Sequence, residues 1–421
     1  GTNWPTSMLR ATARLYDGTI FGGIRLFSRQ TVEIRNCIIT QNSPYGIRFQ
    51  ECDAVVTDSI IRNNSDAGGV SANFSSPVLV RCTIEGNVAT KRRGGFYCKG
   101  GSPELIGCRI EGNIACYRGG GIFCESETEL VLKGCTIIGN YVGCEDCSPN
   151  WGAGLALVRG ATIYAENCIV AGNWAAESAG LSLCEFGGGN LTFFNSTICM
   201  NSARDTVASR CEDRENCTTL FANCILWRNG TLEDCAQLDH CLVGVNPRFV
   251  DPGSFRFTRF QSIVIQGHSY TLPNFVVREP DYRLTEGSPA IDSGTSFAAS
   301  EEDFTGTLRP CGEGVDIGAF EFGDCGKVKF VRGDANSDGL LSVSDVVASV
   351  YFIFLGRSLE CESAADANDD GRVNSAHAIY LLGYLFRGKS QPPPPFPMCG
   401  FDPTGDDLTC EKFEPCPNPQ E

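Results

Sequence analysis

The sequence predicts a mainly β protein, in which short strands stack into a solenoid, followed by a small helical domain near the C-terminus. Two observations lead to this prediction. The first half of the chain repeats a pattern of Cys or Ser, aliphatic and Asn residues at intervals of 22 to 33 residues. The second half holds two Asp- and Asn-rich loops, each followed by an apolar segment with helical spacing.

The repeat places Cys or Ser first, an aliphatic residue two positions later and Asn five positions later. Its eight copies are Cys37/Ile39/Asn42, Ser59/Ile61/Asn64, Cys82/Ile84/Asn87, Cys108/Ile110/Asn113, Cys135/Ile137/Asn140, Cys168/Val170/Asn173, Ser196/Ile198/Asn201 and Cys224/Leu226/Asn229. Most copies also carry a Gly-aliphatic-x-apolar strand further on, as in Gly95 to Cys98. A third short strand precedes each Cys or Ser. Its inward candidates are Ile34, Val56, Leu79, Leu105, Leu132, Phe193 and Phe221.

Strands this short and this close together leave no room for crossover helices. We therefore expect a coil of stacked rungs, in which each rung pairs its backbone with the next and equivalent residues form columns. The Asn column should form an inward ladder, because Asn tolerates the left-handed turn conformation and its amide can bond to the Asn of the next rung. The Cys column also faces inward, as buried thiols or as disulfides between rungs, and the sequence leaves both open. Cys98 and Cys124, at equivalent places in consecutive rungs, are a candidate disulfide pair.

This pattern resembles the right-handed parallel β-helix family, which includes pectate lyases and many bacterial surface proteins. The resemblance covers residues 20 to 232, and we assign residues 1–238 to this domain. It implies the fold but no single function, because the family spans lyases, hydrolases, adhesins and structural spikes.

Residues 239–322 form a second expected segment, in which the repeat fades. It contains Gly287 to Gly294 (GSPAIDSG), Asp303 to Gly306 (DFTG), Arg309-Pro310 and Asp316 to Glu321 (DIGAFE). This order of motifs resembles the choice-of-anchor Q segment that closes many secreted bacterial β-helix proteins. Short apolar runs between Gly, Pro and Asp turns suit a cap over the last rung, which would otherwise expose a strand edge.

The first Asp-rich loop has the ligand spacing of a calcium site. Its oxygen donors occupy loop positions 1, 3, 5, 9 and 12, Gly339 at position 6 allows the sharp turn, and position 7 would act through its backbone carbonyl. In chain order, at positions 1, 3, 5, 7, 9 and 12, the candidate ligands are Asp334, Asn336, Asp338, Leu340, Ser342 and Asp345. A helix follows, with Val346, Val347, Val350 and Phe354 expected on one apolar face.

The second loop repeats the arrangement but differs at position 12. Its candidate ligands are Asp366, Asn368, Asp370, Arg372 and Asn374, whereas position 12 is His377. An apolar helix is expected around Ile379, Leu382 and Leu385. Loss of the last carboxylate predicts a weaker or empty calcium site. The two copies together, over residues 331–389, resemble a type I dockerin module, a resemblance that implies Ca²⁺ as the bound ion.

Dockerins characteristically bind cohesin domains through loop positions 10 and 11. Those positions here are Val343-Ser344 and Ser375-Ala376, which depart from the family's symmetric Ser-Thr pair. A cohesin-like domain is therefore one candidate partner, and another part of the same chain or a second copy is the alternative. The Pro- and Cys-rich tail, residues 390–421, would need disulfides or neighbouring subunits to hold it in place.

The composition bears on the location of the protein and on its partners. The 24 Cys residues suggest an oxidising, extracellular or cell-surface location, whereas Cys144 and Cys147 form a single CxxC pair that gives little support to a zinc site. A net charge of −16 argues against nucleic acid as a partner, and no apolar window is long enough to span a membrane. The chain starts at Gly1 without a leader, as expected of a mature secreted chain; a truncated chain would look the same.

For catalysis, the expected outward columns bring few carboxylates together. Only Glu85 and Glu111 stack, near Arg62 and Arg109, so they are weak catalytic candidates in what is more simply a solvated charge ladder. We therefore interpret the sequence as a secreted structural or assembly protein, self-associating into a filament or surface layer and stabilised by disulfides and calcium. The alternative is a polysaccharide-binding or polysaccharide-degrading protein, a lyase or hydrolase, attached through the dockerin-like module. Outward aromatic residues, Tyr97, Phe123 and Trp227, favour carbohydrate binding.

Overall fold

A computed structural model describes most of the chain. The described residues are 2–4, 8–9, 13–27, 32–143, 151–177, 181–185, 188–203, 207–211, 216–232, 236–265, 268–323, 328–402, 404, 406 and 408–416. The chain divides into two compact units: Gly1–Phe304 with Arg309–Phe322, and Thr305–Leu308 with Gly323–Glu421. No helix among the described residues has the length and apolar character needed to cross a membrane.

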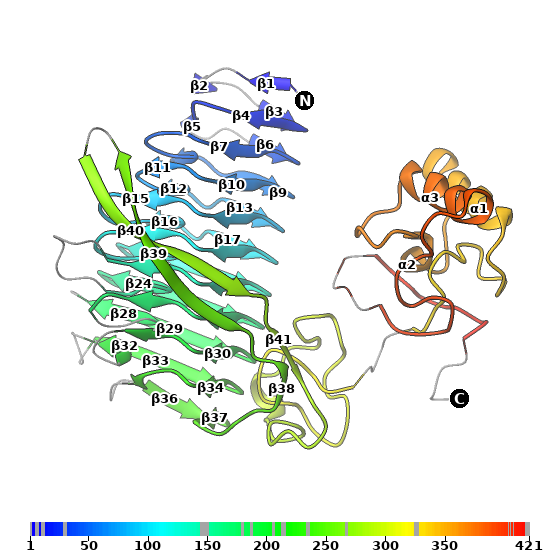
Figure 1. Cartoon of the computed structure of the whole chain (residues 1–421). Coiled ribbons are helices and arrows are strands. Elements are labelled where there is room, and N and C mark those ends of the chain that lie inside the picture. The colour runs from blue at the N-terminus through cyan, green and yellow to red at the C-terminus, as the bar shows by residue number, and fades with distance from the viewer. Residues whose placement is uncertain are drawn as a thin grey trace. The chain divides into compact units, whose positions relative to one another are not determined.

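The first unit is a solenoid of parallel strands (Figure 1). Its described strands form four parallel sheets, which we name A to D, and each strand pairs with its equivalents in the preceding and following rungs. Sheet A contains β1 (Thr2–Trp4), β4 (Gly18–Ile20), β7 (Ile38–Thr40), β10 (Ile60–Arg62), β14 (Thr83–Glu85), β18 (Arg109–Glu111), β22 (Thr136–Ile138), β26 (Ile169–Ala171), β30 (Thr197–Cys199), β34 (Ile225–Trp227) and β37 (Leu242–Val243).

Sheet B contains β2 (Met8–Leu9), β5 (Ile24–Phe27), β8 (Ile47–Gln50), β12 (Val70–Asn73), β16 (Phe96–Lys99), β20 (Ile122–Glu125), β24 (Leu155–Val158), β28 (Ser182–Glu185), β32 (Val207–Cys211) and β35 (Thr231–Leu232). Sheet C contains β3 (Ala13–Tyr16), β6 (Val32–Arg35), β9 (Ala54–Thr57), β13 (Val78–Val80), β17 (Glu104–Ile106), β21 (Glu129–Lys133), β25 (Ala161–Glu166), β29 (Gly189–Phe194), β33 (Cys217–Ala222) and β36 (Ala236–Asp239). Sheet D contains β11 (Ser65–Asp66), β15 (Val88–Ala89), β19 (Ile114–Ala115), β23 (Tyr141–Val142), β27 (Trp174–Ala175) and β31 (Ser202–Ala203).

The three strand patterns found in the sequence correspond to sheets A, B and C, and all seven inward candidates of sheet C are fully buried. The rings of Phe193 and Phe221 stack in consecutive rungs, with centroids 5.4 Å apart. Two features were not predicted. The short strands of sheet D follow the Asn column and bury small residues such as Ala89 and Ala115, and the solenoid continues to Val243, beyond residue 238.

The predicted Asn ladder is confirmed. From Asn42 to Asn201, the Nδ2 of each ladder Asn donates to the Oδ1 of the next, over 2.8 to 3.1 Å. The same Oδ1 also accepts from the backbone N of the preceding ladder Asn, as in Asn64 to Asn87 at 3.0 Å. The left-handed turn residue, however, is not the ladder Asn. It is the residue just before it, such as Asn63 (φ 52°) or Gly86 (φ 58°).

Adjacent residues allow a matched test of the ladder. Asn64→Ala should lower the free energy of unfolding by at least about 3 kcal/mol, because each buried group left unpaired costs about 1–3 kcal/mol. It would leave the Ile39 carbonyl and both the backbone N and Nδ2 of Asn42 without their Asn64 contacts. Urea denaturation followed by Trp fluorescence measures this, since all four Trp residues lie in the first unit.

Asn63→Gly is the control, because Gly also adopts the left-handed conformation of this corner. We expect it to change the free energy of unfolding by less than about 1 kcal/mol. Equal losses in the two variants would contradict the ladder as the source of stability.

The Cys column consists of buried thiols. Cys37, Cys82, Cys108, Cys135, Cys168 and Cys224 are free and buried. Each Sγ contacts the carbonyl two residues earlier, as Cys37 does at 3.2 Å, and Ser59 and Ser196 donate to the equivalent carbonyls. The column therefore needs a small side chain that donates, which explains why either Cys or Ser occupies it. Cys98 and Cys124 are also free and buried, with their sulfur atoms 2.9 Å apart.

Residues 239–304 and 309–322 belong to the same compact unit as the solenoid. They form an antiparallel pair of β38 (Phe249–Asp251) and β41 (Asp281–Leu284), a hairpin of β39 (Ser254–Ile265) and β40 (His268–Arg278), and the 3-10 turn η1 (Ser296–Ala298). The hairpin begins beside β26, where Phe255 lies so close to Gly172 that a Cβ there would be 2.3 Å from the ring. Figure 1 shows the hairpin extending from β38 and β41.

This segment does not act as the expected cap over the last rung. It lies along the side of several rungs, where the corner residues Asn167, Asn195 and Asn223 hydrogen-bond to residues 295–302. Its apolar residues cover the outward face of the last strands of sheet A. The covered cluster contains Ile138, Ile169, Ala171, Cys199, Ile225 and Trp227, packed against Phe249, Tyr282, Leu284, Ala290, Ile317, Ala319 and Phe320. This segment, which we name the lateral segment, thus buries a side face of the solenoid.

A buried ion pair holds this segment together. Arg309 Nη1 lies 2.7 Å from Glu321 Oε2, and both side chains are fully buried. The guanidinium also donates to the carbonyls of Asp316 and Gly318, at 3.0 and 2.8 Å. Burial raises the pKa of Asp316 to about 6. One cation therefore stabilises a buried acidic cluster.

The C-terminal unit contains the described α-helices: α1 (Val343–Leu355), α2 (Glu362–Ala365) and α3 (Ser375–Arg387). Disulfides Cys361–Cys410 and Cys399–Cys416 hold the tail, as expected. The buried Arg332 adds to them, because its guanidinium donates to the Pro394 carbonyl at 2.9 Å and to Asp402 Oδ1 at 2.8 Å. The tail is thus fixed within its own chain.

Both predicted apolar helices are present, but their apolar residues are only partly buried. Val346 is buried, and Val350 and Leu385 are partly buried. Val347, Phe354, Ile379 and Leu382 are instead exposed, by 42, 69, 65 and 39 %. Each helix carries more apolar residues than one inner face can hold, and the small core is formed by Val346, Ala367, Ala378 and Leu381.

Candidate metal centres

The two predicted loops have the same local structure. In the first, Asp334 accepts hydrogen bonds from the backbone N of Asp338 and Gly339, at 3.1 and 2.8 Å. In the second, Asp366 accepts from the backbone N of Asp370 and Gly371, at 3.2 and 2.8 Å. Each loop thus wraps around the carboxylate at its first position, as the repeated sequence pattern requires.

The last position distinguishes the loops. Asp345 is fully buried and turns back into its own loop, where it accepts from the backbone N of Ser342 at 2.7 Å and of Asn336 at 3.3 Å. Together with the Ser342 hydroxyl it forms a capping box at the start of α1. Asp345 therefore supports the helix as well as the loop.

The electrostatics of the first loop favour a bound cation, which would stabilise its carboxylates. Burial, together with the nearby carboxylates of Asp334 and Asp338, raises the pKa of Asp345 to about 6. Burial also raises the pKa of Asp334. The donor set consists of oxygen atoms, which calcium prefers, so these residues fit a calcium ion. Ser342 and Asn374 also serve as helix N-caps, and the side chains of Leu340 and Arg372 are exposed.

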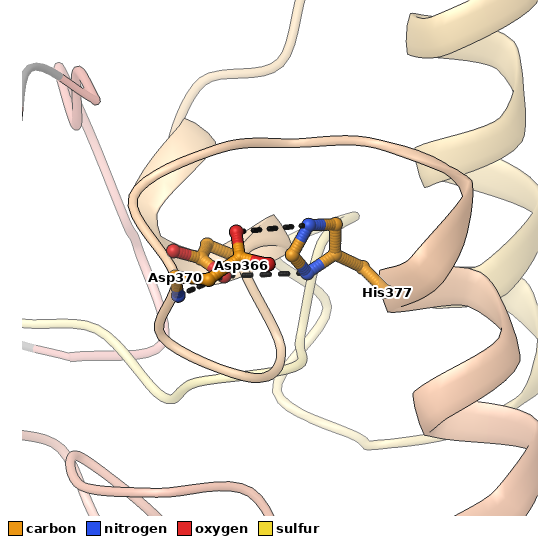
Figure 2. Close-up of side chains that lie close together, drawn as sticks. All are labelled: Asp366, Asp370 and His377. Atoms are coloured by element: carbon orange, nitrogen blue, oxygen red, sulfur yellow. Dashed lines mark hydrogen bonds and ion pairs between the residues drawn. The ribbon is translucent and has the colours of Figure 1, made fainter. Parts of the chain in front are cut away.

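In the second loop, a histidine occupies the interior. His377 is fully buried, with Nδ1 3.2 Å from Asp366 Oδ1 and Nε2 3.6 Å from Asp370 Oδ1. Figure 2 shows the imidazole facing both carboxylates across the loop. Burial lowers the pKa of His377. Asn368 Nδ2 donates to Asp370 Oδ2 at 3.0 Å, equivalent to the 2.7 Å bond between Asn336 and Asp338 in the first loop.

The weak catalytic candidates lie on sheet A as predicted, but both are ion-paired. Glu85 and Glu111 are in register on β14 and β18. Glu85 Oε1 lies 3.6 Å from Arg62 Nη1, and Glu111 Oε2 lies 2.5 Å from Arg109 Nε. Arg109 also pairs with Glu279 at 2.9 Å. Each of these carboxylates therefore has a guanidinium partner, although Glu85 and Glu111 are themselves neighbours in the sheet.

The aromatic residues expected to face outward for carbohydrate binding are buried. Tyr97 and Phe123 are 1 % and 0 % exposed, and they stack with centroids 5.8 Å apart. Trp227 is 6 % exposed, because Phe249 and Tyr282 of the lateral segment lie beside it. These three residues offer no open aromatic platform, so the prediction about them was wrong.

One comparison with known proteins, a family model, agrees with the fold. A family model described as the right-handed β-helix region matches residues 17–169. The crystal structure of the pectate lyase Pel9A aligns with a TM-score of 0.45 and 15% identity, covering 76% of this chain and 85% of that one. No curated protein matches the sequence. The family match and the parallel sheets together identify the first unit as a right-handed parallel β-helix.

Proposed function

We propose that this chain is an extracellular structural protein that self-associates through its C-terminal unit. In this proposal the β-helix is a rigid rod, and the dockerin-like C-terminal unit holds calcium in its first loop and docks against another copy of the chain. The disulfides of the tail support an oxidising location.

The observation that carries the proposal is apolar surface on the two long helices. We name these residues the apolar stripes. On α1 they are Val343, Val347, Tyr351, Phe354 and Leu355, and on α3 they are Ile379, Leu382 and Phe386. Their exposed fractions run from 39 to 69 %. Contiguous exposed apolar surface of this kind marks interaction sites in soluble proteins.

Calcium should act on this surface indirectly. Asp345 sits in the first turn of α1, and its carboxylate caps that helix. A cation among the buried carboxylates of the first loop would therefore fix the start of the helix that carries five of the eight stripe residues. We expect assembly to require calcium for this reason.

We expect the full chain to form oligomers or rods in calcium and to disperse after chelation. Light scattering after size-exclusion chromatography and negative-stain microscopy measure this. The double variant Phe354→Ser/Phe386→Ser should remain monomeric in calcium, because each buried Phe contributes about 1.5–3 kcal/mol.

Phe297→Ser is the control for nonspecific association through an exposed aromatic side chain. Phe297 is 88 % exposed but belongs to the first unit, so its loss should leave assembly unchanged. Monomers of the unaltered chain in both conditions would reject the proposal, and a cohesin-like domain or a polysaccharide would then be the partner to test.

A further inference from the structure

We propose that the second loop binds a divalent transition metal, with zinc as the representative ion, through Asp366, Asp370 and His377. The proposal rests on the proposed role of the C-terminal unit as a metal-binding module. It requires neither self-association nor calcium in the first loop.

The three side chains converge. One potential ligand atom from each of Asp366, Asp370 and His377 lies within 4.8 Å of the other two. Asp366 and His377 are fully buried, and the imidazole points into the loop toward the carboxylates (Figure 2). The cluster combines two oxygen donors with one nitrogen donor at the centre of a closed loop.

The imidazole itself indicates that a ligand belongs there. Neither Nδ1 nor Nε2 of His377 has a hydrogen-bond partner that meets distance and angle criteria among the described residues. Buried polar side chains almost always have such a partner. Asn368 Oδ1, in the same loop, is also buried without a hydrogen-bond partner in the described part of the chain. An ion bound in the loop would give the imidazole a partner and place a positive charge beside the carboxylates.

The donor set determines the class of ion. Calcium takes oxygen ligands, whereas neutral imidazole with carboxylate suits zinc and other first-row divalent metals. One ring nitrogen of His377 would bind the ion, and the other would donate its N–H to a neighbouring carboxylate, as metal-binding imidazoles usually do. The first loop offers Asp345 at the same position, so the two loops should differ in the ion they select.

The architecture around the second loop favours a preformed site. Arg332 Nη2 lies 2.9 Å from Asp369 Oδ1, and Thr404 Oγ1 donates to the same atom at 2.6 Å. The Cys361–Cys410 disulfide ties the tail to the residue just before α2, and α2 leads directly into the loop. The loop is therefore held in shape by contacts that do not involve its metal-facing atoms.

The test compares the full chain with His377→Asp, which gives the second loop the residue found at position 12 of the first. After chelation and dialysis, each protein is titrated with zinc chloride and with calcium chloride by calorimetry, and bound zinc is counted by elemental analysis. We expect zinc binding at this site to weaken more than about 100-fold in the variant, because loss of second-shell partners alone costs about 10–100-fold. The variant should bind one additional calcium ion per chain.

Thiols do not confound the comparison, because both proteins keep all 24 Cys residues. The cobalt(II) spectrum adds a second readout: a site of oxygen and nitrogen donors lacks the sulfur-to-metal charge-transfer band. Equal zinc stoichiometry and affinity in the two proteins, or two calcium ions in the unaltered chain, would overturn the proposal. Failure to self-associate with zinc binding intact would reject only the proposed function.

Discussion

Arg309→Met should destabilise the first unit by about 3–5 kcal/mol, the usual cost of removing one partner from a buried ion pair. The change would leave the buried Glu321 carboxylate without its cation, and the carbonyls of Asp316 and Gly318 without a donor. Asp303, whose carboxylate accepts from the backbone N of Glu321 at 2.9 Å, lies in the same cluster. Urea denaturation followed by Trp fluorescence measures the loss, since the Trp residues report on this unit alone.

Two further variants identify the cause. Arg309→Lys keeps the charge but loses the fork that reaches both carbonyls, so its loss should be smaller than that of Met. Arg309→Met/Glu321→Gln removes both charges while keeping an acceptor for the backbone N of Cys311, now 2.9 Å from Glu321 Oε1, and should recover part of the loss. A change below about 1 kcal/mol in Arg309→Met would contradict the role of the ion pair.

Arg332→Met should have a comparable effect on the C-terminal unit, about 3–5 kcal/mol. Arg332 is fully buried and donates to the carbonyls of Asp366 and Pro394 and to the carboxylate of Asp402. It thus joins the second loop to the Pro-rich tail. Thermal loss of the helical far-UV circular dichroism signal reports this change, because the described α-helices all lie in the C-terminal unit.

The same chain supplies the control for Arg332→Met. The urea midpoint of Trp fluorescence, which follows the β-helix, should stay unchanged in this variant. Limited proteolysis should cut the tail earlier than in the unaltered chain, with the disulfides still present. A shift of both signals would mean that the two units do not unfold independently, and an unchanged helical signal would contradict the role given to Arg332.

Much of the β-helix could be predicted because its interior is periodic. A residue such as Asn113 has the same neighbours in every rung, so the sequence interval determines both its column and its hydrogen bonds. The residues that form the left-handed corners were harder to predict from the sequence. Left-handed corners fall at residues as different as Gln41, Gly139 and Arg228, and residue type alone does not single them out.

The covered face of sheet A could not be predicted from periodicity, but a signal was present. Its outward column changes from Arg62, Glu85 and Glu111 to apolar residues from Ile138 onward. The change falls where the lateral segment covers the sheet. Periodicity says which way a side chain points, whereas its exposure also depends on what a distant segment packs against it.

In the C-terminal unit the loops followed from ligand spacing, and the helix faces did not. Phe354 and Ile379 have helical spacing with the buried residues, so pattern alone could not tell an inner face from an exposed one. The burial of His377 was also missed, because a His at a ligand position suggests loss of an ion more readily than a change of ion. Its missing hydrogen-bond partners become visible only with the coordinates of the described residues.

The Asn ladder also makes the β-helix electrically polar along its axis. Every ladder Oδ1 accepts from the rung that precedes it, from Asn42 to Asn229, and one N–H of each ladder amide from Asn42 to Asn201 donates to the rung that follows it. The side-chain dipoles therefore align along the axis, and aligned amide dipoles add, as they do in a helix. Their positive ends point toward the C-terminal rungs. Two rods that meet end to end can continue this row of amides only when they point the same way, because opposed rods would bring like ends together.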